Sequence, residues 1–440
     1  MVWPSSSSRI KKKGEILAAL DMGSSKIVCF IARREVDDHL RVIGIGHQLS
    51  AGMRGGVITD MDAVERAIRQ ALDAAENMAG LRIDKVAVNI SGNHICSRTC
   101  QLELPLHGRE VNDNDIDRIL GQSPDIAGDG AEHYPQEIIH TIPVGYSLDD
   151  QRGVRDPRGM VGHRLGAQLH VIAAGYGPVR TIGAVLNRLD LEVEQMAVSA
   201  YASGLACLVE DEMDLGSAII DMGAGTTTFA VFFDGQCVYT GGVPMGGMHV
   251  TNDIARGLTT SLNHAERMKT LYGHALPSAA DEREIIDVPQ VGEEAPEFAS
   301  HVPKSQLINI IRPRLEEIFE LVRSKLTGSG FDEAAGRRVV LTGGASQMPG
   351  VREMAQRLLD KQVRLGRPVR IGRPLSHQQA ADAVPYNQGL AEATTGPGFA
   401  TVAGLLAVAM RPSTTVPNLA GEFGRGTWFE RAQYWLKQNV

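Results

Sequence analysis

The feature that most constrains the fold is a short unit that occurs twice in the chain. In each copy an apolar run ends in Asp-Met-Gly, small and hydroxyl residues follow, and a second apolar run begins. The copies occupy residues 16–32 and 217–233. Apolar runs that end at glycine predict strands, so each copy predicts a strand, a tight turn and a strand. Such a duplication predicts two similar domains that face a shared cleft.

Both turns carry groups that bind phosphate. Glycine lets the backbone approach closely, successive N–H groups point at one oxyanion, and hydroxyls and a lysine add donors and positive charge. A single Asp-x-Gly is more often an ordinary hairpin turn, but two matched copies argue against that. The predicted phosphate ligands are Gly23, Ser24, Ser25 and Lys26 in the first turn, and Gly223, Gly225, Thr226 and Thr227 in the second.

The aspartates of the two units end their strands at the predicted cleft. Asp21 and Asp221 precede the glycines of the two turns. A carboxylate at this place suits Mg²⁺, usually through water, because Mg²⁺ gives up its water reluctantly. We therefore predict these two residues as the metal site.

A third glycine turn and a charged pair complete the predicted nucleotide site. A strand at 339–341 leads into Gly343, Gly344 and Ala345, where paired glycines let the backbone lie against a flat adenine ring. Glu266 and Lys269 stand three residues apart on a predicted helix, where they can grip a ribose hydroxyl. Such a pair is also common on an ordinary solvated helix.

The rest of the chain predicts further elements. Helical spacing predicts helices at 63–78, capped by Asp62, at 178–189, with Pro178 at its first position, and at 316–325. Residues 92–168 hold clusters of Gly, Pro, Asn and Asp, and predict a small inserted α+β unit with only short strands. One helix is expected there at 111–120, opened by Asn112 or Asp113. A buried strand is expected at 168–175.

The tryptophans mark the two ends of the chain. They are Trp3, Trp428 and Trp435. Residues 412–427 predict a flexible linker. At about 100° per residue, the apolar residues that follow fall within an arc of roughly 140° on a helix over 428–440. We predict that this helix lies in a membrane interface; docking on its own core or on a partner protein are the alternatives. Its membrane-facing residues are Trp428, Phe429, Ala432, Trp435 and Leu436.

Composition narrows the class and compartment. The formal net charge of -8 argues against nucleic acid as the main partner. The five cysteines have no zinc or CxxC spacing, so we expect small buried hydrophobes. No apolar run is long enough to span a bilayer. Residues 1–13 hold serines and basic residues with no apolar region behind them, which predicts a disordered arm and a cytoplasmic chain.

Together the motifs resemble the actin-type ATPase superfamily. The order is a phosphate turn, a connecting helix at 197–208, a second phosphate turn, the adenosine turn and a final connecting helix at about 399–410. Within that superfamily the chain resembles the FtsA family of bacterial division proteins. The resemblance rests on the Asp-Met-Gly-Ser-Ser-Lys turn, the insert after the strand at 86–92, the tail, and Ile311-Arg312-Pro313-Arg314 followed by Glu316 and Glu317.

The resemblance implies an α/β, actin-like (ribonuclease H-like, duplicated) fold with an inserted α+β 1C subdomain and a C-terminal amphipathic helix. The implied boundaries are a basic arm at 1–14, subdomain 1A at 15–91 and 169–208, 1C at 92–168, 2A at 209–249 and 336–411, 2B at 250–335, a linker at 412–427 and a membrane-targeting helix at 428–440.

The resemblance also implies a function. It implies an ATP- and Mg²⁺-binding protein that polymerises and tethers FtsZ filaments to the cytoplasmic face of the inner membrane at the division site. Subdomain 1C would meet later division proteins. The C-terminal peptide of FtsZ would be held by Arg312, Arg314 and Glu317. The connecting helix offers no carboxylate where chaperone relatives place a Glu-Pro pair, so we expect slow hydrolysis and a mainly structural nucleotide.

Three other classes share the predicted fold. A PilM-type pilus-assembly ATP-binding scaffold is the main alternative, although it does not predict an aromatic tail after a linker. A sugar kinase needs a catalytic carboxylate and a sugar pocket, and the sequence indicates neither. A DnaK-type chaperone needs a β-rich substrate domain after residue 410, where only 30 residues remain.

Overall fold

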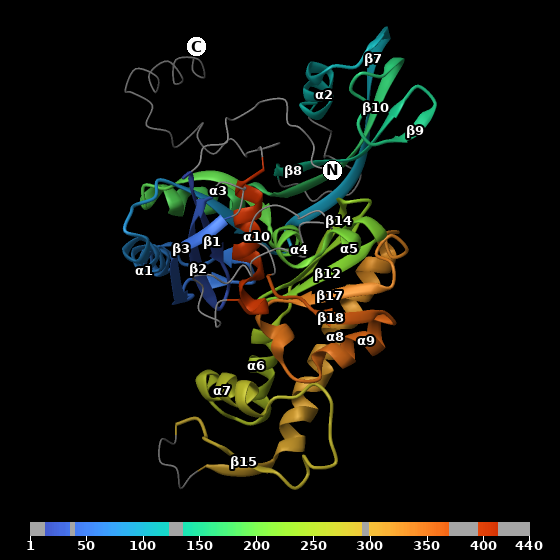
Figure 1. Cartoon of the computed structure of the whole chain (residues 1–440). Helices are drawn as coiled ribbons and strands as arrows, with labels where there is room; N and C mark the ends of the chain where they lie inside the picture. The colour runs from blue at the N-terminus through green and yellow to red at the C-terminus, as the bar shows by residue number, and fades with distance from the viewer. Residues whose placement is uncertain (1–13, 36–39, 123–134, 293–298, 369–394, 412–440) are drawn as a thin grey trace.

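Two five-stranded sheets with the same strand order form the body of the protein (Figure 1). The computed structural model describes residues 14–35, 40–122, 135–292, 299–368 and 395–411. In spatial order the first sheet is β3 (Leu40–Leu49), β2 (Lys26–Arg34), β1 (Ile16–Met22), β6 (Lys85–Ile90) and β11 (Glu192–Val198). The second is β14 (Gln236–Val243), β13 (Thr227–Phe233), β12 (Ser217–Met222), β17 (Arg338–Thr342) and β18 (Gln362–Leu365).

The pairing directions also repeat. β1 runs antiparallel to β2 and parallel to β6, and β12 runs antiparallel to β13 and parallel to β17. The central strands are buried along nearly their whole length because helices cover both faces of each sheet, which explains their continuous apolar runs. The duplication predicted from the two Asp-Met-Gly units is confirmed by this shared topology.

Two helices lie between the sheets. These are α4 (Ser199–Cys207) and α10 (Ala400–Ala409), and Figure 1 shows α10 in red between the two halves. Every residue of α4 is buried, and so is all of α10 except Ala409. Their small residues allow a close crossing: a Cβ built on Gly404 would lie 1.8 Å from the Ala202 carbonyl oxygen. The two helices are therefore part of the core that joins the halves.

Helix α1 (Met61–Ala79) packs on the first sheet by the face that its spacing predicts, with Val64, Ile68 and Leu72 buried. The predicted cap was wrong. Asp60, with φ of −142°, is the N-cap, and its side chain accepts from the N–H groups of Asp62 and Ala63. The helix therefore begins at Met61, two residues before the predicted start, because its fully buried face begins only at Val64.

The inserted unit is a four-stranded antiparallel sheet that projects from the body at the upper right of Figure 1. Its elements are β7 (Ile95–Glu110), α2 (Asp113–Leu120), β8 (Gln136–Leu148), β9 (Gln151–Val154) and β10 (Val161–Gly175). Asn112 opens α2 in a capping box with Asp115, as one of the two predicted openings. The expectation of short strands was wrong, because β7 and β8 both pair with β10 over long stretches, with register shifts such as the one between Gly162 and Arg164.

The predicted strand at 168–175 is the second half of β10. Helix α3 (Tyr176–Arg188) begins at once after it, so Pro178 is its third residue and not its first. A proline in the first turn still costs no helical hydrogen bond, because the first N–H groups of a helix have no partner within it. This explains why the sequence rule found the helix but misplaced its start.

The second half carries more helices than the first. They are α5 (Glu210–Leu215), α6 (Gly247–Gly257), α7 (Leu262–Tyr272), α8 (Lys304–Gly328) and α9 (Val351–Leu359), with a small sheet of β15 (Ile285–Val288) and β16 (Ser300–Pro303). Helix α8 is far longer than the predicted 316–325 and contains Pro313. Its buried residues, from Leu307 to Leu326, stabilise the helix beyond the proline, where propensity alone predicts a break.

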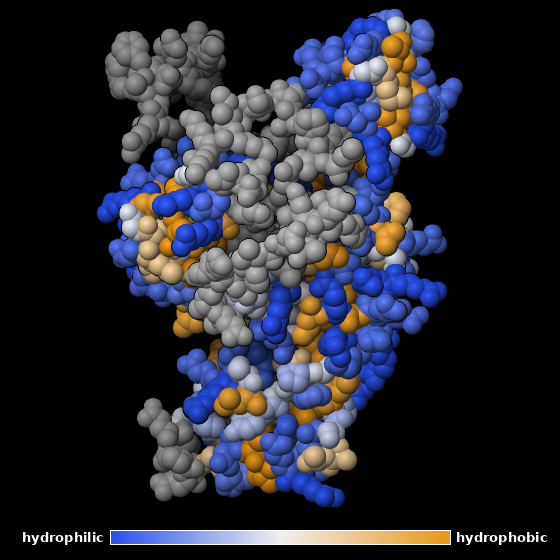
Figure 2. Space-filling view, in the orientation of Figure 1, coloured by the Kyte–Doolittle hydropathy of each residue, from blue (hydrophilic) through white to orange (hydrophobic). Residues whose placement is uncertain are grey.

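The surface is mostly hydrophilic on the face seen in Figure 2, with apolar residues in scattered stripes. Among the helices that the structure describes, none is both long and apolar enough to cross a membrane. The predicted basic arm before Gly14, the linker at 412–427 and the helix at 428–440, with its membrane-facing residues, lie outside the described residues.

Candidate functional site

The two Asp-Met-Gly turns have the same local geometry. In the first, the Gly23 N–H donates to the Lys26 carbonyl oxygen at 3.0 Å; in the second, the Gly223 N–H donates to the Thr226 carbonyl oxygen at 2.9 Å. The strand registers also match. Met22 pairs with Ile27 in the first copy, and Met222 pairs with Thr227 in the second. The two turns are therefore structural equivalents.

The turns meet across the gap between the halves. A Cβ built on Gly225 would lie 2.5 Å from Ser24 Oγ and 3.0 Å from the Gly55 nitrogen. The Gly56 N–H donates to Ser24 Oγ at 3.3 Å, so a loop between β4 (Met53–Arg54) and β5 (Val57–Ile58) closes the same place. The structure thus brings together the predicted phosphate ligands of both turns.

The hydroxyls of Thr226 and Thr227, in the second turn, differ in whether they are free to donate to a ligand. The hydroxyl of Thr227 donates to the Met245 carbonyl oxygen at 2.8 Å, so its one hydrogen is used within the second half. Thr226 lies one residue earlier and is partly exposed. The carbonyls of Gly223 and Ala224 accept from the first N–H groups of α6, at 2.9 and 2.8 Å. Thr226 is therefore the better placed hydroxyl donor of the second turn.

Asp21 is held by an amide from the neighbouring strand. Asn89 Nδ2 donates to Asp21 Oδ1 at 2.7 Å and to Ser199 Oγ at 3.1 Å, while Asn89 Oδ1 accepts from the Met22 N–H at 2.7 Å. Burial raises the pKa of Asp21 to about 7, Lys26 opposes that rise, and Asp221 adds to it. A buried carboxyl with this pKa is partly protonated at neutral pH unless a cation joins it.

Asp221 is held by two hydroxyls from the helices between the sheets. Ser203 Oγ and Thr401 Oγ1 donate to Asp221 Oδ2 at 2.6 and 2.9 Å. Burial raises the pKa of Asp221, and the two hydroxyls and Lys26 oppose the rise. The two carboxylates thus come from different sheets, and Asp221 is near enough to raise the pKa of Asp21.

Lys26 lies between the two aspartates and the start of α10. Its Nζ is 3.9 Å from the centroid of the Phe399 ring, and a Cβ built on Gly398 would lie 2.8 Å from that Nζ. Burial lowers the pKa of Lys26, and the two aspartates oppose the fall. A partly desolvated lysine beside two carboxylates is suited to bind an anion that also carries a cation.

The third turn lies directly on the second aspartate. Gly343 has φ of +86°, and a Cβ built on it would lie 2.4 Å from Asp221 Oδ1. The Gly343 N–H donates to the Pro397 carbonyl oxygen at 3.1 Å. A Cβ built on Gly344 would meet nothing within 4 Å, so this side of the turn is open. Gly343 is thus needed because a side chain would clash with Asp221, whereas Gly344 leaves its side of the turn open to a ligand.

The charged helical pair lies beside the third turn. Lys269 Nζ, on α7, donates to Glu266 Oε2 at 2.6 Å and to the Gly247 carbonyl oxygen at 3.1 Å. A Cβ built on Gly247 would lie 3.2 Å from the Ala345 Cβ and 3.6 Å from Lys269 Nζ. The predicted adenosine residues therefore lie together.

Sequence reasoning missed the residues that support the two aspartates. These are Asn89, Ser203 and Thr401. A signal was present for the first, because a lone asparagine interrupts the apolar run Val-Ala-Val-Asn-Ile of β6. The two hydroxyls gave no comparable signal, since small residues fill both helices and only the crossing brings them to one oxygen.

The chemistry of the two aspartates fits Mg²⁺. Both are buried carboxylates whose pKa burial raises, so a cation beside them would offset their desolvation. In the described part of the chain, no group of three or more His, Cys, Asp or Glu side chains is placed to hold a metal by itself.

The residues predicted to hold a partner peptide lie on α8. Arg314 Nε donates to Asp253 Oδ2 at 2.6 Å, Nη2 donates to Asp253 Oδ1 at 3.2 Å, and Nη1 donates to Glu317 Oε2 at 2.5 Å. Arg312 Nε donates to Glu316 Oε1 at 2.8 Å. Arg314 thus joins α8 to α6, and its guanidinium is largely engaged within the protein, whereas Arg312 is more exposed.

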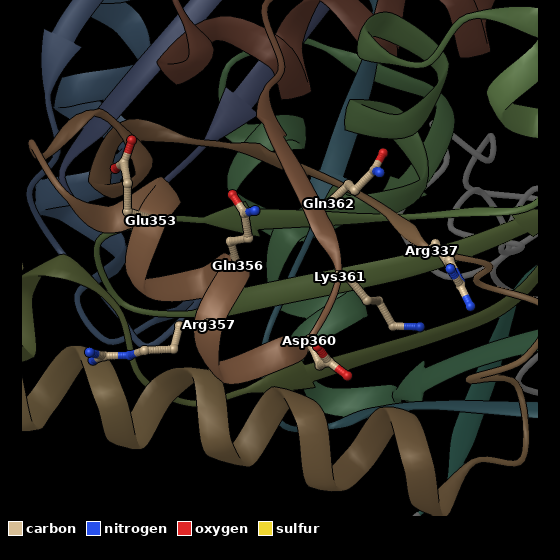
Figure 3. A pocket seen from close by; sticks show the side chains of 7 residues that line it. All are labelled: Arg337, Glu353, Gln356, Arg357, Asp360, Lys361 and Gln362. Atoms are coloured by element: carbon tan, nitrogen blue, oxygen red, sulfur yellow. The ribbon is translucent and has the colours of Figure 1, made fainter.

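A cavity of about 720 Å³ lies elsewhere, near α9 and β18, and holds none of the predicted site residues. It is lined by Arg337, Glu353, Gln356, Arg357, Asp360, Lys361 and Gln362. In Figure 3 these side chains point in different directions and do not converge on one place. The cavity has a polar lining, and the surroundings of Asp21 and Asp221 remain the better candidate site.

Comparison with known proteins agrees with this geometry. The model of the family described as "Cell division protein FtsA" matches residues 218–404, and that of the "SHS2 domain inserted in FTSA" matches residues 92–173. A cell division protein FtsA of Rhizobium meliloti is 41% identical over 442 residues, which cover 97% of this chain and 96% of that protein. The chain belongs to the FtsA family.

More distant relatives cover the same length. The cell division protein FtsA of Pseudomonas aeruginosa is 34% identical over 97% of this chain and 99% of its own. A chain of a solved PilM-PilN type IV pilus biogenesis complex has a TM-score of 0.61 and 17% identity, covering 90% of this chain and 99% of its own. That likeness is one of fold. The fold is the duplicated actin-like α/β fold, with an SHS2 domain inserted as the FtsA family has it.

Proposed function

We propose that this cell division protein binds ATP with Mg²⁺ in the cleft between its two sheets. The observation that carries the proposal is the pair of buried aspartates, Asp21 and Asp221, one from each sheet, with Lys26 beside both. Burial raises the pKa of both carboxyls, and Asp221 raises that of Asp21 further, so a bound cation would stabilise their ionised forms. Functional sites concentrate such groups.

Each part of the cleft has a role in this proposal. The N–H groups and hydroxyls of the two equivalent turns, with Lys26, bind the phosphates. Gly343, Gly344 and Ala345 present backbone to the adenine, and Glu266 with Lys269 binds the ribose. Asp21 and Asp221 would hold Mg²⁺, which would supply positive charge to offset that of the phosphates. The open side of Gly344 and the contact of Gly247 with Ala345 support this orientation of the nucleotide.

Hydrolysis is proposed to be slow. Helix α4 crosses the cleft with Ser199 and Ser203 toward the aspartates, and it contributes no carboxylate that could orient a water. The nucleotide would then act mainly by joining the halves of the protein.

The wider role is that of an adaptor. We propose that the protein polymerises, binds the C-terminal peptide of FtsZ near Arg312, Arg314 and Glu317, contacts later division proteins through its 1C subdomain, and attaches to the cytoplasmic face of the inner membrane through residues 428–440. A short interfacial helix is a weak anchor. Many such helices on one filament bind far more firmly through effective concentration, so attachment would depend on polymerisation.

A titration of the purified protein with a fluorescent ATP analogue, with and without Mg²⁺, tests the nucleotide proposal. We expect saturable binding that Mg²⁺ strengthens, and a Gly223→Asp variant that does not bind. Binding that neither Mg²⁺ nor this substitution affects would refute the cleft. Pull-down with a synthetic FtsZ tail peptide separates the adaptor from a PilM-type scaffold, because only the former should retain the peptide.

A further inference from the structure

One oxygen of Asp221 receives hydrogen bonds from two different helices. Ser203 Oγ, on α4, donates at 2.6 Å, and Thr401 Oγ1, on α10, donates at 2.9 Å. Both hydroxyls are buried, with exposed fractions of 0% and 8% for their residues. Each hydroxyl has one hydrogen and gives it to the same acceptor, so the arrangement fits the ionised carboxylate.

The two hydroxyls lie beside the close crossing of α4 and α10. Ser203 follows Ala202, whose carbonyl oxygen would lie 1.8 Å from a Cβ built on Gly404. Thr401 is one helical turn before that glycine. The hydroxyl oxygens are themselves 3.1 Å apart. Because the backbones are already in contact here, any slide of one helix along the other moves one hydroxyl away from Asp221.

The same face of α4 also contacts Asn89, the residue that holds Asp21. Ser199 Oγ accepts from Asn89 Nδ2, which donates to Asp21. Ser199 and Ser203 are four residues apart and therefore lie on one side of the helix. One helix thus contacts the supports of both carboxylates, which come from different sheets.

We propose that Ser203 and Thr401 are positioning residues for the cation and nucleotide site, which fix Asp221 to the crossing of α4 and α10. The proposal rests on the proposed function of the cleft. Asp221 Oδ2 is occupied by the two hydroxyls, while Oδ1 is the oxygen against which Gly343 packs. The carboxylate is thus held in one rotamer, ready for a hydrated ion, and its position depends on the angle between the helices.

The test compares a variant that removes the hydroxyl with one that keeps it. Thr401→Val keeps the shape of the side chain and removes the donor, whereas Thr401→Ser keeps the donor. Removing one hydrogen bond to a charged group should weaken Mg²⁺-dependent binding of the ATP analogue by about tenfold. We expect Thr401→Ser to stay within about twofold of wild type. Binding in excess EDTA should be the same in all three proteins.

A buried threonine outside the site provides the matched control. In the part of the chain that the structure describes, Thr240 Oγ1 is buried without a hydrogen-bond partner. Thr240→Val should therefore leave the Mg²⁺ dependence unchanged. If Thr401→Val does not fold, as its melting curve without nucleotide would show, Ser203→Ala removes the other donor and should weaken the Mg²⁺-dependent binding in the same way.

The outcomes separate this inference from the function on which it rests. Wild-type protein that shows no Mg²⁺-dependent binding would defeat the proposed function. Wild-type binding with an unchanged Mg²⁺ dependence in folded Thr401→Val or Ser203→Ala would overturn the positioning role alone. An equal loss in Thr401→Val and Thr401→Ser would also overturn it, because shape and not the hydroxyl would then be the cause.

Discussion

His170 Nδ1, in the inserted sheet, lies 2.8 Å from the Cys237 carbonyl oxygen in the second five-stranded sheet. A carbonyl only accepts, so Nδ1 carries the hydrogen and Nε2 accepts from Ser97 Oγ at 2.6 Å. Ser97 Oγ in turn accepts from the Thr240 N–H at 3.2 Å. The insert leaves the chain between strands of the first sheet, yet this chain of hydrogen bonds attaches it to the second.

The neutral state of this histidine predicts a pH dependence of stability. Burial lowers the pKa of His170 to about 4, and burial, with His170 and Arg411, lowers the pKa of His140 to about 3. The unfolded chain binds protons at these residues below about pH 6.5 and the folded chain does not, so stability falls as pH falls from 6.5 toward 4. The loss is about 1.4 kcal/mol per pH unit for each histidine.

Denaturant unfolding at pH 7 and pH 5 measures this effect. Because carboxylates titrate too, the informative quantity is the difference between wild type and His170→Gln. The variant should lose about 2 kcal/mol less than wild type over this interval. Equal losses in both proteins would show that His170 is not the group that titrates.

Gly343→Asp should block nucleotide binding. The residue has φ of +86°, and its Cβ would lie 2.4 Å from Asp221 Oδ1, so a side chain and a second charge would enter the metal site. Gly330→Ala is a matched control, because Gly330 also has positive φ (+78°) but open space around its Cβ position. It reports the backbone strain alone, about 1–3 kcal/mol. Undiminished affinity for ATP in Gly343→Asp would count against the cleft.

Gly404→Ala should destabilise the whole protein. Its Cβ would come within 1.8 Å of the Ala202 carbonyl oxygen, so α10 must move from α4. Overpacking of this kind costs about 1–3 kcal/mol or more. Gly328→Ala, at the end of α8, meets nothing within 4 Å and should change the free energy of unfolding little. Similar chemical denaturation curves for the two variants would contradict the tight crossing.

Charge reversal at Arg314 should weaken binding of the FtsZ tail peptide and also lower stability. Arg314→Glu would place a third carboxylate beside Asp253 and Glu317. Arg312→Glu breaks only the pair with Glu316, so it should affect the peptide more than the melting temperature. Peptide titration of both folded variants checks this, and equal affinity to wild type in both would remove α8 from the proposed binding surface.

Deletion of residues 428–440, or Trp428→Glu, should abolish binding to vesicles while ATP binding persists. Co-sedimentation with liposomes measures the first and the fluorescent analogue the second. The aromatic face of the predicted helix provides the affinity for the interface. Unchanged pelleting of the truncated protein would defeat this assignment.

The sequence alone was enough to predict the duplication, because each Asp-Met-Gly turn needs its own glycine and each flanking strand is buried on both faces. Those requirements are local, and they leave a pattern of apolar runs and turn residues that can be read along the chain. The buried face of α1 and the opening of α2 near Asn112 were predictable for the same reason.

Only the tertiary structure decided what surrounds the two aspartates. Asn89, Ser203 and Thr401 come from a strand and two helices that are far apart in sequence, and each is a small polar residue in an apolar segment. The length of the inserted strands and the continuation of α8 past Pro313 were likewise decided by burial against other segments. Local patterns fix where a turn forms, but a hydrogen bond between distant segments exists only where packing places its donor and acceptor together.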